Sequence, residues 1–199
     1  MSSTNRSGQH YTQRKANSDY YVTPVAEITK FLDALYVDQP QYGRLLTVLD
    51  PCAGGDRGGG HEMSYPVALR RSKFNVVQLD TMDIRQDSLA ERKKDYLTAK
   101  VETQYDMIIT NPPFLLAKEI ILKGMQEVKQ GGLVIMLLRL NFFGSAQWRD
   151  FWRNQMPTFC YVHSKRMKFT EAAGTDSVEY MHCVWERGNN PVHTRLSII

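Results

Sequence analysis

The chain has 199 residues, of which 42% are hydrophobic and 23% are charged, and it carries a net charge of +4. This composition is that of a globular protein, so we expect a single domain over residues 19–199 after a flexible basic arm of residues 1–18. No apolar run approaches the ~20 residues of a membrane span, and the polar N-terminus lacks the apolar core of a signal peptide. Three widely spaced cysteines fit neither a disulfide framework nor a zinc site. We therefore expect a cytoplasmic protein with no membrane partner and no metal.

Buried strands and amphipathic helices alternate along the chain. The expected strands are residues 45–50, 75–83, 106–110, 133–140, 159–165 and 178–185. The expected helices are residues 25–35, 65–71, 88–94, 115–130 (capped by Gly131-Gly132) and 145–155, and an irregular loop is expected over 167–177. This order predicts an α/β fold with a doubly wound, mostly parallel sheet that closes with an antiparallel strand pair.

The segment Asn111-Pro112-Pro113-Phe114 follows the strand expected over 106–110. An asparagine before a proline is held in extended backbone, and each proline fixes φ and lacks an N–H. The segment is therefore a stiff turn with few donors, at the carboxyl end of a strand, where open α/β sheets bind ligands. Its carbonyl oxygens suit the hydrogens of an amine on a planar group, because Phe114 can stack on the ring of that group.

A loop of small residues follows the first strand and reads Asp50-Pro51-Cys52-Ala53-Gly54-Gly55. Small residues at a strand exit let a ligand approach the backbone. A dinucleotide-binding fold would show G-x-G-x-x-G opening a helix directly, whereas this loop continues through residues 56–63. The loop is therefore a candidate cofactor site of a different kind.

Two further segments accompany these motifs. Tyr21-Val22-Thr23-Pro24 is a short extended stretch before the first helix, and Asp95-Tyr96-Leu97 follows the second strand. That strand ends in a carboxylate, for which Asp80 and Asp83 both qualify, and we favour Asp83 because Ile84 follows it.

Together these segments resemble the S-adenosylmethionine-dependent adenine-N6 DNA methyltransferases. The resemblance covers about residues 19–143, with four motifs in the order that this family uses. Residues 176–185 look like the tail of small phage-type members of the family. The resemblance implies a Rossmann-like fold of the class I methyltransferase type, S-adenosyl-L-methionine as the cofactor and DNA as the partner, with no separate target-recognition domain.

The resemblance also implies a role for each motif. The residues that it implies to contact the cofactor are Tyr21, Thr23, Asp50, Pro51, Cys52, Ala53, Gly54, Gly55, Asp83, Ile84, Asp95, Tyr96, Leu97 and Asn111. Catalysis falls to Asn111, Pro112, Pro113 and Phe114, where Asn111 Oδ1 and the Pro112 carbonyl accept the amine hydrogens of the acceptor. The methyl acceptor would be the N6 amine of an adenine that has been flipped out of the DNA duplex.

Basic residues are concentrated in residues 139–168, which follow the strand after the catalytic motif. If this region borders the site, its exposed cations are candidates for binding phosphates. The candidates are Arg149, Arg153, Lys165, Arg166 and Lys168.

Two alternatives to DNA methylation stay open. Related enzymes with the same fold methylate guanine N2 in RNA or a glutamine amide in protein, and the small size of the chain is compatible with either acceptor. A third possibility is a methyltransferase-like subunit that binds nucleic acid without catalysis, against which the intact Asn111–Phe114 and Asp50–Gly55 segments argue.

Overall fold

The computed structural model describes residues 20–43, 45–169 and 177–199, so the predicted arm and part of the predicted loop 167–177 lie outside the described residues. The strands are β1 (Leu46–Asp50), β2 (Val76–Asp83), β3 (Arg92–Lys93), β4 (Tyr105–Thr110), β5 (Val128–Arg139), β6 (Phe159–Val162), β7 (Tyr180–Glu186) and β8 (Arg195–Ile198). The helices are α2 (Val25–Asp38), α3 (Ser64–Arg71), α4 (Ala117–Glu127) and α5 (Arg149–Asn154), with the 3-10 turns η1 (Pro40–Gly43), η2 (Phe114–Leu116) and η3 (Leu140–Gly144).

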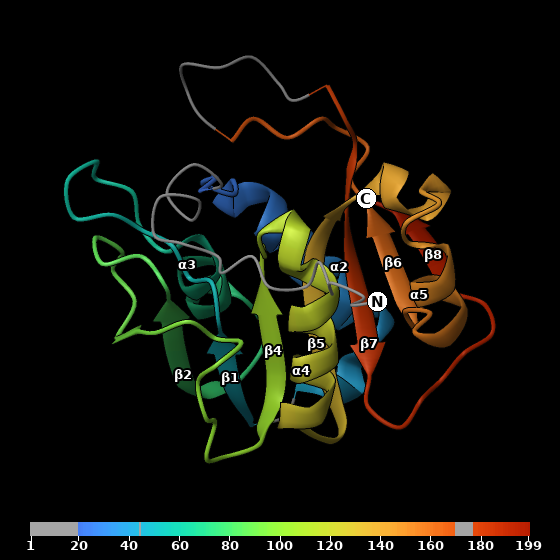
Figure 1. Cartoon of the computed structure of the whole chain (residues 1–199), viewed down its shortest axis with the longest axis horizontal. Helices are drawn as coiled ribbons and strands as arrows, with labels where there is room; N and C mark the ends of the chain where they lie inside the picture. Colours follow the sequence, from blue (N-terminus) through green and yellow to red (C-terminus); the bar gives the residue numbers. More distant parts are fainter. Residues whose placement is uncertain (1–19, 44, 170–176) are drawn as a thin grey trace, which may run out of the picture.

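The strands form one 8-stranded sheet in the order β3-β2-β1-β4-β5-β7-β6-β8 (Figure 1). β7 runs antiparallel to both of its neighbours, and the other neighbouring strands pair in parallel. The predicted doubly wound, mostly parallel sheet with an antiparallel closing pair is therefore confirmed.

Two apolar clusters cover opposite faces of the sheet. One contains Ile28 and Phe31 of α2, and the other contains Ile120 of α4 and Trp152 of α5. Figure 1 shows α4 in front of β5 and α2 behind the sheet. Met107, Ile108 and Ile109 of β4 alternate between the two clusters, as the period of two in a strand requires. Because β1, β2, β4 and β5 pair in parallel, their carboxyl ends meet at one edge of the sheet.

The predicted helix over 115–130 extends three residues too far at its C-terminal end. α4 ends at Glu127, and β5 begins at Val128, which already pairs with β4. Gly131 and Gly132 do not cap a helix but form an irregularity within β5. The Gly131 N–H donates to the Arg187 carbonyl and the Arg187 N–H donates to the Gly132 carbonyl, each at 2.9 Å. These bonds to the end of β7 satisfy the backbone as a strand, and the φ of +72° at Gly131 explains the glycine there.

Other boundaries also differ from the prediction. Residues 88–94 contain no helix, because Arg92–Lys93 pair with β2 as the short strand β3. The helix expected over 145–155 is reduced to α5, and β6 ends at Val162 rather than at residue 165. β8 was not predicted: it is an edge strand paired only with β6, and its exposed residues present no buried run. None of the described helices is long and apolar enough to cross a membrane.

Candidate active site

Two adjoining cavities open at the carboxyl edge of the sheet. Every residue predicted to contact a cofactor, apart from Asp50, lines the first cavity. Residues Pro112, Phe114 and Arg139 line the second cavity, and Tyr21, Asn111 and Pro113 line both. The two halves of the predicted site are therefore neighbours in space, although residues 21 and 139 are far apart in the chain.

The glycine loop after β1 is held against the end of β2. The Gly54 N–H donates to Asp83 Oδ2 and the Arg85 N–H donates to Asp83 Oδ1, each at 2.8 Å. Burial raises the pKa of the Asp83 carboxyl, and the two N–H donors oppose that rise. Gly54 has a φ of +67°, and a Cβ there would lie 2.7 Å from the ring of Tyr20. The position therefore favours glycine both for its conformation and for its space.

Of the two candidate acids in β2, Asp83 lines the first cavity. Its competitor Asp80 lies outside the cavity lining, where it accepts hydrogen bonds from the Tyr105 hydroxyl and from Arg92, the latter at 3.1 Å. Because Asp80 is engaged in this separate network, Asp83 is the residue placed to accept hydrogen bonds from a ligand. A ribose diol is a ligand group that a carboxylate can hold in this way.

Asp50 lies beneath the loop instead of lining the cavity, so we correct its predicted contact with the cavity. Its side chain is fully buried, and Oδ1 accepts a hydrogen bond from the Cys52 N–H at 3.2 Å. Burial raises the pKa of Asp50 to about 7. The Thr110 hydroxyl lies near the Asp50 carboxyl and lowers its pKa. The two groups do not meet the geometry of a hydrogen bond, so Asp50 Oδ2 has no hydrogen-bond partner among the described residues. Asp50 therefore shapes the loop from below.

The loop after β3 and the cysteine of the glycine loop add to the walls of the first cavity. The Leu97 N–H donates to Asp95 Oδ1 at 3.0 Å, which closes a tight turn and leaves Asp95, Tyr96 and Leu97 along the cavity. Burial raises the pKa of the Cys52 thiol well above its usual value, so this cysteine stays protonated and is a poor nucleophile.

The orientation of Asn111 is set by the segment before α2. Asn111 Nδ2 donates to Thr23 Oγ1 at 3.1 Å, across 88 positions of the chain. Since the amide nitrogen is used in this way, Asn111 Oδ1 remains as an acceptor between the two cavities. The exposed ring of Tyr21 stands beside it and lines both cavities.

Aromatic residues surround Phe114 in the second cavity. The ring of Phe142 meets Phe114 edge-on with 5.7 Å between centroids, and the guanidinium of Arg139 lies 4.7 Å from the Phe114 centroid. Phe169 lies in the segment after β6, and its ring meets the ring of Tyr21 edge to face with 5.7 Å between the centroids. Phe142 and Phe169 thus support the second cavity from behind residues that line it.

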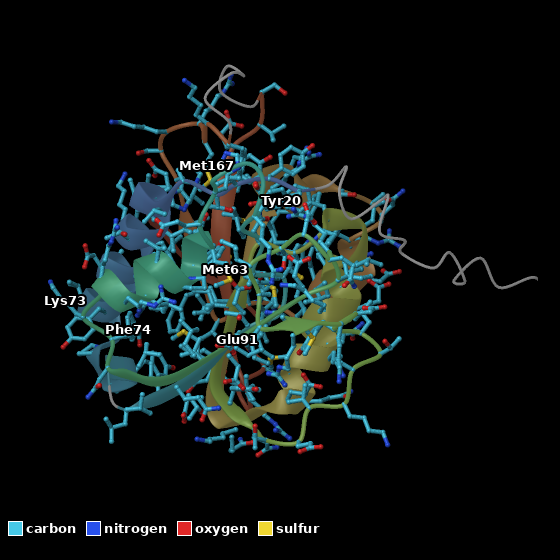
Figure 2. The ribbon with its side chains drawn as sticks, turned by 90° about the vertical axis from the view of Figure 1, so that its left-hand side faces the viewer. Tyr20, Met63, Lys73, Phe74, Glu91 and Met167 are labelled. Carbon is cyan, nitrogen blue, oxygen red and sulfur yellow. The ribbon has the colours of Figure 1, made fainter. Side chains whose placement is uncertain are left out.

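The predicted basic residues fall on two separate elements. Lys165, Arg166 and Lys168 are exposed on the segment after β6, where Met167 and Phe169 pack inward beside Phe114. Figure 2 shows Tyr20 and Met167 toward the same end of the molecule, with Phe74 toward the other.

The other two basic candidates, Arg149 and Arg153, are exposed on α5. This helix is anchored by Trp152 in the apolar cluster that contains α4. The segment after β6 does not line the second cavity, but its Phe169 contacts Tyr21, which does.

Three residues that the sequence reasoning missed also belong to this region. The Arg85 guanidinium stacks on the ring of Tyr20 at 3.7 Å and both residues line the first cavity. Arg139 closes the second cavity at the end of β5. The sequence does contain a signal for Arg85 and Arg139, because each follows or ends a strand. Charged residues at strand exits lie where open α/β sheets bind ligands.

Comparison with known proteins identifies the fold. No protein-family model and no curated protein matches the sequence. Among solved structures, a protein described as a class I S-adenosylmethionine-dependent methyltransferase from Listeria monocytogenes superposes with a TM-score of 0.65 at 13% identity, covering 96% of this chain and 74% of that chain. The type I restriction enzyme EcoKI M protein gives a TM-score of 0.61 at 13% identity, covering 92% of this chain and 48% of its own.

A third similar structure is the N-methyltransferase NodS from Bradyrhizobium japonicum WM9 in complex with S-adenosyl-L-homocysteine. It has a TM-score of 0.53 at 9% identity and covers 84% of this chain and 89% of that chain. The present chain has the Rossmann-like fold of the class I S-adenosylmethionine-dependent methyltransferases. It spans about half the length of the EcoKI M protein, with 48% of that chain covered.

Proposed function

We propose that this protein transfers a methyl group from S-adenosyl-L-methionine to the N6 amine of adenine in DNA. The observation that carries the proposal is the shared wall of the two cavities, where Asn111 and Pro113 line both. A cofactor in the first cavity and an acceptor in the second would meet at this wall. The similarity to the EcoKI M protein, a subunit of a type I restriction enzyme, favours DNA as the acceptor.

The first cavity suits S-adenosylmethionine. Asp83 offers a carboxylate to the ribose hydroxyls. Gly54 has a positive φ that favours glycine, and a glycine places no side chain between the loop and a ligand. The exposed face of Tyr21 suits a sulfonium through cation–π attraction. When bound, this cofactor supplies a methyl group on a sulfonium. The complex of NodS with S-adenosyl-L-homocysteine supports the same choice of cofactor.

The residues of the second cavity explain how an aromatic amine becomes a nucleophile. The lone pair of such an amine is delocalised into its ring. Asn111 Oδ1 and the Pro112 carbonyl oxygen accept hydrogen bonds from the two N–H groups of the amine. These bonds favour a more tetrahedral nitrogen with an available lone pair. Phe114 stacks on the ring, so positioning and fixed dipoles supply the rate enhancement. A base must leave the duplex to reach this cavity, at a cost of a few kcal/mol for unstacking.

The deciding experiment follows the labelled methyl group. The protein is incubated with methyl-labelled S-adenosylmethionine and with DNA, RNA or a protein extract, and nucleoside digestion identifies the product. We expect N6-methyladenine from DNA in the wild-type reaction and about 100-fold less with Asn111→Ala. Label in RNA guanine or in a protein glutamine would replace the acceptor while retaining the enzyme class. Cofactor binding without transfer to any of the three acceptors would support a non-catalytic subunit.

A further inference from the structure

Arg139 presents an unmatched cation to the second cavity. It is the last residue of β5, and it lines the cavity together with Asn111 and Phe114. Its guanidinium lies over the ring of Phe114, and its Nε is buried without a hydrogen-bond partner. No carboxylate of the described residues pairs with it.

Arg85 and Arg92 differ from Arg139 in having a carboxylate partner, although Nε and one terminal nitrogen of Arg85 are also buried without a hydrogen-bond partner. Arg85 bonds to Asp87 at 2.7 Å, and Arg92 bonds to Asp80 at 3.1 Å. A guanidinium has five N–H donors and no acceptor, and a buried donor without a partner costs about 1–3 kcal/mol. Arg139 therefore combines a buried unpaired donor and the lack of a carboxylate partner with a place in the second cavity, where a ligand would supply the acceptor.

The polarity of the second cavity defines the group that fits it. Asn111 Oδ1 is left as an acceptor because the amide nitrogen is bonded to Thr23. Arg139 adds donors within the same cavity. The complementary ligand has an amine beside a hydrogen-bond acceptor on one planar ring. Adenine has this arrangement on both sides of its N6 amine, since N1 and N7 are both acceptors.

We infer that Arg139 is a specificity-determining residue that donates a hydrogen bond to a ring nitrogen of the acceptor base, N1 or N7 of adenine. This inference rests on the proposed function and adds the residue that reads the ring. It explains why a cation ends an otherwise apolar strand. A phosphate contact from the same residue would make binding tighter without reading the base, and a substrate with an altered ring distinguishes the two.

The test combines a variant with a modified base. After the methylated adenine has been mapped, oligonucleotides carry adenine, 1-deazaadenine or 7-deazaadenine at that position, and single-turnover methylation is measured for the wild type and for Arg139→Met. Methionine keeps an unbranched chain over Phe114 but removes every donor. A hydrogen bond to a charged donor corresponds to about 10- to 100-fold in rate.

We expect the wild type to lose this factor with one deaza analogue. Arg139→Met should lose the same factor with adenine and lose nothing further with that analogue. The affinity of Arg139→Met for S-adenosylmethionine, measured by calorimetry, should stay within about threefold of the wild-type affinity. A threefold change in affinity is smaller than the typical effect of losing one hydrogen bond. Arg195→Met is the matched control, because Arg195 lies 4.8 Å over the ring of Phe159 but is exposed on β8, outside both cavities.

The outcomes are distinct. If Arg139→Met slows all three substrates by the same factor, Arg139 does not contact the ring, and the inference is overturned. If the variant matches the wild type on every substrate, it is overturned as well. If the wild type methylates no DNA, the proposed function fails first and the assignment of Arg139 to a base falls with it. Thermal unfolding of both variants verifies that they are folded.

Discussion

Asp50→Asn tests the buried carboxyl beneath the glycine loop. Burial, reinforced by the charge of Asp83, raises the pKa of Asp50 from 3.8 to about 7. The nearby Thr110 hydroxyl and the hydrogen bond from the Cys52 N–H oppose this rise without cancelling it. Asparagine has the same shape but no titrating proton, so the substitution isolates the effect of this one charge.

The direction of the pH effect on stability depends on which state, folded or unfolded, binds the proton of Asp50 more tightly. A carboxyl whose pKa is higher in the folded chain than in the unfolded chain is protonated first in the folded state. Its contribution to stability is complete below pH 3.8 and is lost as the pH rises through about 7. At about 1.4 kcal/mol for each pH unit between these values, the contribution is ~4 kcal/mol. Asp50→Asn should therefore gain stability relative to the wild type as the pH rises.

Urea unfolding of both proteins without cofactor, at several pH values between about 5 and 8, measures this difference. Buried His163 and His182 have lowered pKa values, so their contribution to stability is lost as the pH falls below 6.5. Both histidines are present in both proteins, and their effect cancels in the difference. A difference in unfolding free energy that stays constant over this range would refute the raised pKa of Asp50.

The remaining predictions concern the two cavities and their rim. Asn111→Ala and Phe114→Ala should each lower methyl transfer by about 100-fold while calorimetry finds nearly unchanged cofactor affinity, because each removes a group that holds the methyl acceptor. Near-normal turnover in both would remove the catalytic assignment. Gly54→Ala should weaken cofactor binding and lower the melting temperature, since an L-residue at its φ of +67° costs about 1–2 kcal/mol. Lys168→Glu should reduce the salt slope of DNA affinity by about 0.9 for each phosphate that is no longer neutralised, with Arg153→Glu as the comparison on α5. Salt-independent binding would move the DNA surface elsewhere or favour a protein acceptor.

Much of the fold could be predicted because the central strands are buried on both faces. The runs that became β1 and β4 are almost wholly apolar or buried, so their position in the sheet follows from hydrophobicity alone. The boundary after α4 could not be predicted in this way, because Val128 fits either a helix or a strand. Its pairing with Tyr105 decides the matter, and that contact is made only in the folded sheet.

Most of the lining of the first cavity could also be predicted, since most of its motifs are short segments that follow a strand. Asp83 and Gly54 are 29 positions apart, yet each could be assigned from its own neighbours, and their hydrogen bond joins the two motifs. Asp50 was misplaced for a related reason. A carboxylate at the end of a strand can point into the cavity or under the loop, and only the backbone turn at Cys52 selects the second direction.

The acceptor half depends on contacts between distant segments. Thr23 fixes the amide of Asn111 from 88 positions away, and the Arg139 guanidinium reaches Phe114 from a different strand. Neither contact leaves a local pattern, because each residue alone has the spacing of an ordinary loop or strand terminus. The sequence could therefore indicate Asn111 as a candidate acceptor for an amine, whereas Arg139 joins the same cavity only because the end of β5 lies beside Phe114.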